Sequence, residues 1–421
     1  MALLSNFGGV AVFASMMITL LVHLPYQVIS TSRTASTVEG FLGGLCASSV
    51  HIHGYKCQEF QVSTDDGYIL SVQRIPPHRS SSVVGSDGPK TSRPSPPVLL
   101  QHGLLVDGMT WLLNSPGQSL AFILADSGFD VWISNIRGTR FSRRHVTLNA
   151  NINPEFWDWT WDDLIMNDLP AVINFIFKQT GQKLHYVGHS LGTLMALASF
   201  SSGNEKQVVD KVKSAALLSP IAYLSHMTTA FGVVAARSFV GEITTMFGLA
   251  EFNPKGEPVA IFIKAICAQP GVDCYDLLTE LTGKNCCLNS TVVDLFLNTE
   301  PQPTSTKNLV HLAQTVRDGR LAKYDYGNAN FNLEHYGNVK PPAYDLTRIP
   351  RDLPIFLSYG GRDALSDVKD MEALLDDLKN HDIDKLHVQY IKDYAHVDFI
   401  MGLTANDLVY NQIIKFFNNQ Q

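Results

Sequence analysis

Charge, cysteine and metal-binding motifs are all scarce in this sequence. Only 17% of its 421 residues are charged, and 32 basic residues against 39 acidic ones give a formal net charge of -7. Because there is neither a basic surplus nor a stripe of mixed basic and aromatic residues, we do not expect a nucleic-acid-binding protein. The sequence has no C-x-x-C pair and no H-E-x-x-H motif, so we expect no metal and no cofactor. Nothing in it indicates an obligate protein partner.

The N-terminus contains no charged residue before Arg33, and residues 8–24 are almost all apolar or small. We expect residues 1–30 to be a secretory signal peptide, because an apolar core is followed by small residues near Ser30. The alternative is an uncleaved membrane anchor, since the apolar stretch is nearly long enough to cross a bilayer. Export leads to the extracellular space or to a vacuole or lysosome, and the chain ends without an ER-retention signal.

The six cysteines form an even set, and an exported chain can form disulfides. Cys46 and Cys57 are close enough to staple the N-terminal segment of residues 31–57, and Cys267 and Cys274 can close a short loop. Pairing cannot be deduced from the sequence alone.

The remaining two cysteines, Cys286 and Cys287, are adjacent. We do not expect them to bond to each other, because a bridge between neighbouring residues is strained. Asn289 follows closely and begins an N-S-T sequon, so it is a candidate glycosylation site, consistent with export.

Strand-like and helix-like segments alternate along most of the chain. Residues 58–75 suit a β-hairpin, and residues 76–97, rich in proline, serine and glycine, suit a mobile surface linker. The expected strands that follow are PVLLQHG, FDVWISN, KLHYVG, KSAALLSP, PIFLSYGG and KLHVQYI. The expected helices are SLAFILADSG, TWDDLIMNDLPAVINFIFKQTG, SLGTLMALASF, DVKDMEALLDDL and TANDLVYNQIIKFF. This alternation predicts an α/β fold with a mostly parallel sheet and helices on both faces.

The alternation lapses between residues 221 and 344, where helix-like apolar runs replace it. We expect this segment to be a mostly helical cap and lid, inserted into a core made of residues 58–220 and 345–421. Open α/β sheets bind ligands at the carboxyl ends of their strands, so the cap is expected to cover a site at that edge.

The sequence GHSLG, residues 188–192, lies where the strand-like KLHYV meets the helix-like TLMALASF. A G-x-S-x-G motif at a strand-to-helix turn holds its serine above the sheet as a nucleophile. Ser190 is therefore the candidate nucleophile, and the amide of Leu191 is a candidate oxyanion donor. The second donor should follow an earlier strand, where HGLL supplies the amide of Leu104.

A serine nucleophile needs a histidine base and a carboxylate that orients it. Asp363 follows the late strand SYGG, with Asp367 as an alternative that also suits a helix cap. His396 lies between the last expected strand and the last expected helix. The chain order of Ser190, Asp363 and His396 is the order that an α/β-hydrolase requires.

Other conspicuous residues have structural interpretations. The aromatic run FWDWTW, residues 156–161, suits core packing better than contact with lipid. RGTRFSRR, residues 137–144, suits a solvated loop whose arginines pair with local carboxylates rather than an anion site. His189 is not placed to act as the base and is expected to pack under the turn, and Asp168 is expected to be structural.

The motifs HGLLVDGMTWLLN, HYVGHSLGT, YGGRDALSDVKD and YAHVDFI, in this order, resemble the acid lipase family of α/β-hydrolases, which includes gastric and lysosomal lipases. The resemblance runs from about Val50 to about Phe417 and is strongest with the plant triacylglycerol lipase-like members. It implies a hydrolase core with a helical cap and the same triad and oxyanion residues. Gastric-type enzymes have Gln after the nucleophile where this chain has Leu191, but a backbone donor survives that exchange.

The residues and the resemblance together predict a serine hydrolase that cleaves lipid esters, most of all triacylglycerols, through an acyl-serine intermediate. Its partner is a lipid substrate at an oil-water or membrane interface. The alternative is a carboxylesterase or acyltransferase acting on smaller or other lipid esters. A binding protein that kept the fold but lost the chemistry is disfavoured, because such a protein typically lacks a triad residue.

Overall fold

The computed structural model describes residues 44–77, 94–202, 206–237, 239–246, 248–256 and 277–420. The expected signal peptide of residues 1–30 and the loop between Cys267 and Cys274 lie outside the described residues, as does most of the expected linker. In the described part of the chain, no helix is both long enough and apolar enough to span a membrane.

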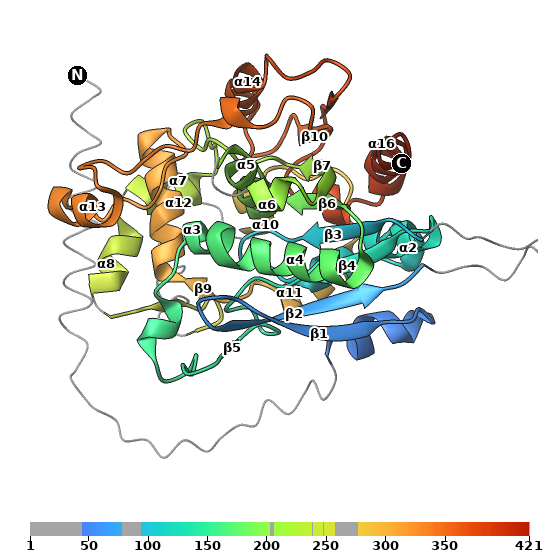
Figure 1. The fold of residues 1–421 in the computed structure, drawn as a ribbon, viewed down its shortest axis with the longest axis horizontal. Coiled ribbons are helices and arrows are strands. Elements are labelled where there is room, and N and C mark those ends of the chain that lie inside the picture. The colour runs from blue at the N-terminus through green and yellow to red at the C-terminus, as the bar shows by residue number, and fades with distance from the viewer. Residues whose placement is uncertain are drawn as a thin grey trace, which may run out of the picture.

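A central nine-stranded sheet carries the fold (Figure 1). Its strands are β1 (Gln58–Ser63), β2 (Tyr68–Ile75), β3 (Pro97–Gln101), β4 (Asp130–Ser134), β5 (Arg144–His145), β6 (Leu184–His189), β7 (Val212–Leu218), β10 (Ile355–Gly360) and β11 (Leu386–Ile391). Their order is β1-β2-β4-β3-β6-β7-β10-β11, with β5 beside β2. β2 is antiparallel to its neighbours β1, β4 and β5, and all pairs from β4 to β11 are parallel. The expected hairpin and the mostly parallel sheet are both confirmed.

Helices cover both faces of this sheet, as the sequence predicts. The core helices are α2 (Leu120–Asp126), α3 (Trp161–Asp163), α4 (Leu169–Thr180), α5 (Leu191–Ser201), α6 (Lys206–Val209), α14 (Val368–Asp377), α15 (Asp398–Met401) and α16 (Asn411–Asn418). Local signals set their ends: Thr160 and Asp163 form a capping box at the start of α3. Gly181 ends α4 in a left-handed conformation with a φ of 66°.

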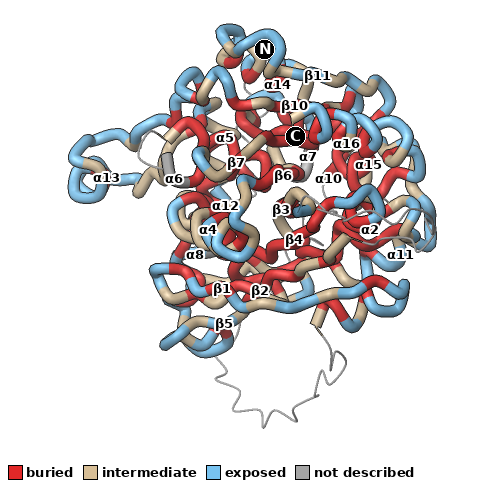
Figure 2. Tube along the Cα trace, turned by 45° about the vertical axis from the view of Figure 1, so that its right-hand side comes forward, coloured by how far each residue is buried: buried red, intermediate tan, exposed pale blue. Residues whose placement is uncertain are grey.

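Successive strand residues point to opposite faces, which creates two hydrophobic cores. In β3, Leu99 belongs to the core formed with α4, α5 and α14, whereas Val98 and Leu100 belong to the core formed with α2, α15 and α16. The central strands are buried along almost their whole length (Figure 2). A sheet buried on both faces is therefore anchored firmly enough to hold its strand-end loops in fixed positions.

Between β7 and β10 the described chain is mostly helical. It contains α7 (Ala230–Arg237), α8 (Val240–Met246), α10 (Leu277–Thr282), α11 (Ser290–Thr299), α12 (Thr306–Asp318) and α13 (Ala329–Tyr336), with the short strands β8 (Glu251–Phe252) and β9 (Thr304–Ser305). Helices α8, α12 and α13 gather at one end of the molecule (Figure 1), where α12 packs against α7 and α8. We propose this segment, residues 221–344, as the cap.

The aromatic run at residues 156–161 is core packing: Phe156, Trp157, Trp159 and Trp161 are all buried. The expectation of a solvated arginine loop is wrong for Arg137, which is 1% exposed. It bonds to the carboxylates of Asp66 and Asp168, and its guanidinium lies 3.8 Å from the Tyr68 ring centroid.

The arginine partners come from distant segments rather than from the loop itself. Arg140 pairs with Asp107 and Arg143 pairs with Glu251. The expectation of local carboxylate partners was wrong, because the tertiary fold brings separate loops together around this basic run. Asp168 is structural, as expected, since its carboxylate neutralises the buried Arg137.

Disulfides join two of the cysteine pairs among the described residues. Cys46 is bonded to Cys57, which confirms the expected staple. Cys286 is bonded to its neighbour Cys287, so the expectation that these two would not pair is wrong. The amides of both residues donate to the carboxylate of Asp398, at 3.1 and 3.2 Å, and so hold the peptide in a tight turn. Adjacent sulfurs meet there because the tertiary contact shapes the turn.

Candidate active site

The predicted site residues follow four parallel strands whose carboxyl ends meet at one edge of the sheet. Ser190 follows β6, Leu104 lies in the loop after β3, Asp363 follows β10 and His396 follows β11. This is the edge at which open α/β sheets bind ligands. The topology therefore brings residues from four distant parts of the chain to the same place.

Ser190 occupies a strained turn between β6 and α5. Its φ of 55° and ψ of -121° lie in a region that non-glycine residues rarely adopt. The flanking glycines permit this close approach, because a Cβ at Gly192 would lie 2.4 Å from the carbonyl oxygen of Gln101. A Cβ at Gly188 would lie 2.8 Å from the backbone of Gly192. The strand-turn-helix context that the motif requires is thus present.

Asp363 and His396 form a buried pair. Nδ1 of His396 lies 3.0 Å from each carboxylate oxygen of Asp363, whose Oδ1 also accepts the amides of Leu365 and Ser366. Burial alone would raise the pKa of Asp363, but the His396 ring and these two amides together hold it below the usual value. The alternative acid, Asp367, instead caps α14 by accepting the amide of Lys369. Of the two acids, the structure brings Asp363 to His396.

The hydrogen bond to ionised Asp363 places the His396 proton on Nδ1 and leaves Nε2 as an acceptor. Nε2 is buried and has no hydrogen-bond partner among the described residues. It is therefore available to take a proton, although no bond between it and Ser190 is formed here, and such bonds often tighten only with substrate.

His189 sits beneath this arrangement rather than within it. Its Nε2 donates to the carbonyl oxygen of His396 at 2.9 Å, and the two rings are 4.8 Å apart. Burial, with the nearby His396 ring, lowers the pKa of His189 to about 3, so it stays neutral. It links the end of β6 to the histidine loop, which fits the packing role that the sequence suggested.

The loop after β3 lies directly against the serine. A Cβ built on Gly103 would be 2.8 Å from Cβ and 3.3 Å from Oγ of Ser190, so only glycine fits there. Leu104 follows next, and Leu105 has a positive φ of 59° that turns the loop sharply. Leu191 is the first residue of α5, where a backbone N–H has no partner within the helix. Both proposed oxyanion donors thus lie next to Ser190 in the chain or in space.

The cap also reaches this pair, through a contact that the sequence did not indicate. The carbonyl oxygen of Thr282, at the end of α10, accepts the amides of His396 and Ala364. Gly283 forms a β-bridge with Asp363, and a Cβ there would clash with the carbonyl of Arg362 at 2.1 Å. The backbone of the proposed cap therefore holds Asp363 and His396 in place together.

Asp398 is the second residue that sequence reasoning missed. It is fully buried two positions after His396 and accepts the amides of Ala395, Cys286 and Cys287. Its position in the segment HVDF was the only signal. Asp398 and the two sulfurs are also close enough for a metal site, but sulfurs joined in a disulfide lack the thiolate that binds metal.

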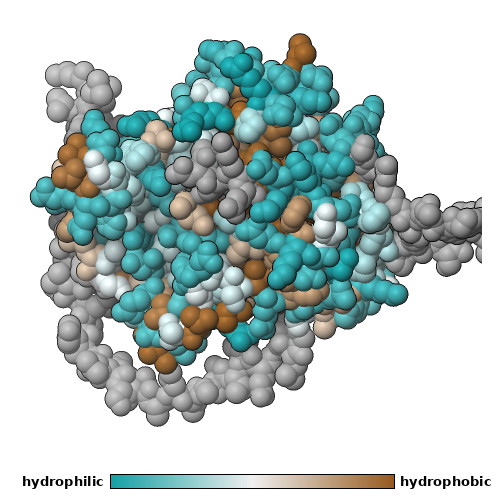
Figure 3. All heavy atoms as spheres, viewed as in Figure 1, coloured by the Kyte–Doolittle hydropathy of each residue, from teal (hydrophilic) through white to brown (hydrophobic). Residues whose placement is uncertain are grey.

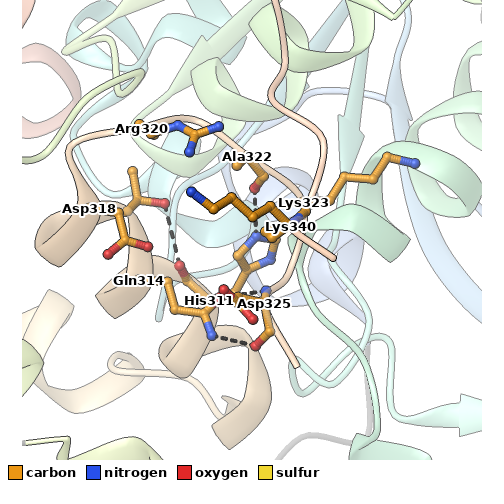
Figure 4. A pocket seen from close by; sticks show the side chains of 10 residues that line it. His311, Gln314, Asp318, Arg320, Ala322, Lys323, Asp325 and Lys340 are labelled. Carbon is orange, nitrogen blue, oxygen red and sulfur yellow. Dashed lines mark hydrogen bonds between the residues drawn. The ribbon is translucent and has the colours of Figure 1, made fainter. Parts of the chain in front are cut away.

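Two cavities lie elsewhere. One of about 210 Å³ is lined by His311, Gln314 and Arg320 on and after α12, together with Lys323 and Asp325 from the segment that follows (Figure 4). His311 Nε2 is hydrogen-bonded to the carbonyl oxygen of Ala322, and the Gln314 side chain is hydrogen-bonded to the backbone of Asp325, so these groups already have partners in the cavity wall. Another of about 340 Å³ lies between residues 150–157 and 248–256. None of the predicted catalytic residues lines either cavity.

Comparisons with known proteins show which family this chain resembles. Residues 46–115 match the family described as partial alpha/beta-hydrolase lipase region, and residues 96–265 match alpha/beta hydrolase fold. Triacylglycerol lipase 2 of Arabidopsis thaliana is 60% identical over 378 residues, which cover 90% of this chain and 88% of that protein. Gastric triacylglycerol lipase of Rattus norvegicus is 36% identical over 403 residues, covering 92% and 97%.

A solved structure shares the fold. The soluble variant of monoglyceride lipase from Saccharomyces cerevisiae, in complex with a substrate analog, matches with a TM-score of 0.52 at 14% identity, covering 87% of this chain and 98% of that one. The sequence identity to the two triacylglycerol lipases extends over nearly their whole lengths. This chain therefore belongs to the acid lipase family of α/β-hydrolases.

Proposed function

We propose that this protein is a serine lipid-ester hydrolase that releases fatty acids from triacylglycerols. The observation that carries the proposal is the buried Asp363–His396 pair at the same sheet edge as Ser190, a serine held in a strained strand-to-helix turn. Ser190, Asp363 and His396 are proposed as the catalytic residues, with the amides of Leu104 and Leu191 as oxyanion donors. No step of this chemistry requires a cofactor.

In the first half of the reaction, Oγ of Ser190 attacks the ester carbonyl carbon while Nε2 of His396 takes the hydroxyl proton. The carbonyl oxygen becomes an oxyanion, which the two backbone amides stabilise. The ester C–O bond then breaks, and His396 gives its proton to the departing alcohol oxygen. An acyl group remains on Ser190, and Asp363 stabilises the imidazolium throughout.

In the second half, a water molecule attacks the acyl carbon and gives its proton to His396. The bond from the acyl carbon to Ser190 breaks, and the proton returns to the serine oxygen. The products are one fatty acid and the free enzyme. His396 therefore moves the proton in both halves of the reaction without leaving its place beside Asp363.

The surface of the proposed cap suits a lipid substrate. Several large apolar side chains are exposed there: Phe239, Met246, Leu249, Leu295, Leu297, Phe331, Leu333 and Val339. The face shown in Figure 3 is mainly hydrophilic, and the apolar groups at its lower left lie where Figure 1 places β5 rather than the proposed cap. Exposed apolar groups of this kind favour contact with a lipid surface. We also propose that the chain is exported through the secretory pathway and is glycosylated at Asn289, an exposed residue that caps α11. Disulfides form in proteins exported by this route, so the disulfides of this chain are consistent with export.

Fatty-acid release from emulsified triolein and from a soluble butyrate ester tests this function. The wild-type chain is compared with Ser190→Ala and with Ser115→Ala, which removes an exposed hydroxyl from a residue that is not among the proposed catalytic residues or oxyanion donors. We expect the wild type and Ser115→Ala to cleave both substrates, to prefer triolein, and Ser190→Ala to lose all activity above background.

Each other outcome selects a different function. Cleavage of the butyrate ester alone makes the protein a carboxylesterase, and transfer of the acyl group to an added alcohol in preference to water makes it an acyltransferase. Activity that survives in Ser190→Ala removes the serine from the mechanism. A wild-type chain that binds lipid but cleaves no ester at any pH is a binding protein with the same fold.

A further inference from the structure

A short stretch of the cap, residues 300–302, is joined to the oxyanion loop, residues 104–107. The amide of Gln302 donates to the carbonyl oxygen of Leu105 at 2.7 Å, and its side chain accepts the amide of Arg140 at 3.1 Å. Leu105 is the residue with the positive φ, next to the proposed donor Leu104. The geometry of this loop therefore depends on what holds residues 300–302 against it.

The side chains at this junction are buried carboxyl groups. Asp107 and Glu300 are both 0% exposed. Oδ2 of Asp107 is 2.6 Å from Nε of Arg140, and its Oδ1 accepts the amide of Met109. Asp107 is therefore paired and capped as a carboxylate, and it shapes the turn that follows Leu104.

Glu300 has no such support. Neither of its carboxyl oxygens has a partner with good hydrogen-bond geometry among the described residues, and the nearby Gln302 side chain only partly offsets its burial. The charged groups that act on it are Asp107 and Arg140, and Arg140 already serves Asp107. A second buried carboxylate beside Asp107 would have to share Arg140 with it, and this attraction is outweighed by burial and by the Asp107 charge, so the ionised form is unfavourable. A carboxylic acid at this position, in contrast, has an O–H to donate and Asp107 beside it to accept.

We propose that Glu300 is a positioning residue for the oxyanion loop: it is held as a neutral carboxylic acid, donates to the Asp107 carboxylate, and so ties the cap to the loop that carries Leu104. This inference rests on the proposed hydrolase function for its effect on catalysis. The proton on Glu300 does not depend on that function.

A consequence follows for the pH range of the enzyme. Burial and the neighbouring Asp107 charge raise the pKa of Glu300 from 4.5 to about 9. Nearby His102 is neutral, because burial lowers its pKa to about 4, and so it adds no charge that would offset a second carboxylate. Above the Glu300 pKa, two carboxylates face each other and the loop loses its tie to the cap.

The test compares wild type, Glu300→Gln, Glu300→Ala and Glu155→Gln, an exposed control. Gln is uncharged and still donates, so it imitates the protonated form. The kcat and KM for the soluble butyrate ester are measured from pH 5 to 10, and the infrared spectrum of each protein is recorded at pH 7 for the carbonyl band of a protonated carboxylic acid.

We expect wild type and Glu155→Gln to lose kcat with an apparent pKa near 9, with little change in KM. Glu300→Gln should keep its kcat at pH 7 within about threefold and should lose the alkaline fall, while Glu300→Ala should lose at least about tenfold in kcat at every pH. The infrared band of the Glu300 carboxylic acid should be present in wild type and in Glu155→Gln and absent from both Glu300 variants. An alkaline fall that persists unchanged in Glu300→Gln, or a band that persists in it, overturns the proposal.

The two proposals fail differently. A chain that cleaves no ester but shows the Glu300 infrared band refutes the hydrolase function and retains the neutral acid. A chain that cleaves esters but lacks the band retains the function and refutes the role of Glu300.

Discussion

Replacing Asp363 with asparagine tests the catalytic geometry most directly, because the hydrogen bonds around that carboxylate dictate how the amide must lie. Oδ1 accepts the amides of Leu365 and Ser366 at 2.9 and 2.8 Å. In Asp363→Asn, the side-chain carbonyl must stay with these two donors, so the NH₂ group turns toward Nδ1 of His396. Nδ1 then becomes an acceptor, and the ring proton moves to Nε2.

A histidine with its proton on Nε2 cannot take the proton of Ser190. The fold, by contrast, is preserved, because both backbone amides keep their acceptor and the shapes of the side chains are nearly the same. We therefore expect kcat to fall by about 10³- to 10⁴-fold, or about 4 to 5 kcal/mol of transition-state stabilisation. The free energy of unfolding should change by only about 1 kcal/mol.

The assay is hydrolysis of the soluble butyrate ester at saturating substrate, together with thermal unfolding of each variant. Asp367→Asn is the matched control: Asp367 caps α14, and asparagine caps a helix as well as aspartate does, so this variant should keep wild-type activity. If Asp363→Asn retains kcat within tenfold of wild type, or if Asp367→Asn loses it, the tautomer argument and the choice of acid are both refuted.

Three further outcomes are expected. Gly103→Ala places a methyl group against Ser190 and should lower kcat about 100-fold, with some loss of stability because the loop must shift to admit it; equal kcat in the variant would contradict the close packing seen in the loop. Asp168→Asn leaves Arg137 under-neutralised in the core and should cost about 3 to 5 kcal/mol in urea unfolding, whereas a cost below about 1 kcal/mol would make that ion pair unimportant. Glu300 keeps a proton in the folded state that the unfolded chain loses above pH 4.5, so stability should fall as pH rises toward 9, on the order of 3 kcal/mol by pH 7. Glu300→Gln should lack that fall, and an identical pH profile of stability in the two proteins would refute it.

Local patterns in the sequence were enough to predict the elements that position the site. The run LHYV followed by GHSLG was recognisable as a strand, a turn and a helix, because apolar periodicity and glycine placement act over a few residues. Thr160 and Gly181 marked helix ends for the same reason. Asp363, the predicted acid, is the carboxylate that the structure places beside His396, and Asp367 has the local role of a helix cap that the sequence suggested.

Contacts between distant segments could not be predicted in this way. The amides of Cys286 and Cys287, which are bonded to each other, both donate to Asp398, 112 and 111 positions further along the chain, and local patterns give no sign of this contact. Arg137 looked like a surface residue in a basic run, and its burial became visible only with Asp66 and Asp168 around it.

The sequence by itself therefore determined the order and type of the elements, the position of the proposed nucleophile and the chain order of the three proposed catalytic residues, because each of these depends on local periodicity, capping or turn chemistry. Only the tertiary structure decided which carboxylate meets His396, how the cap backbone at Thr282 holds that pair, and where Glu300 and Asp107 face each other. The physical reason is that burial and charge pairing depend on every segment that packs around a group, and the chain supplies those segments from positions far apart.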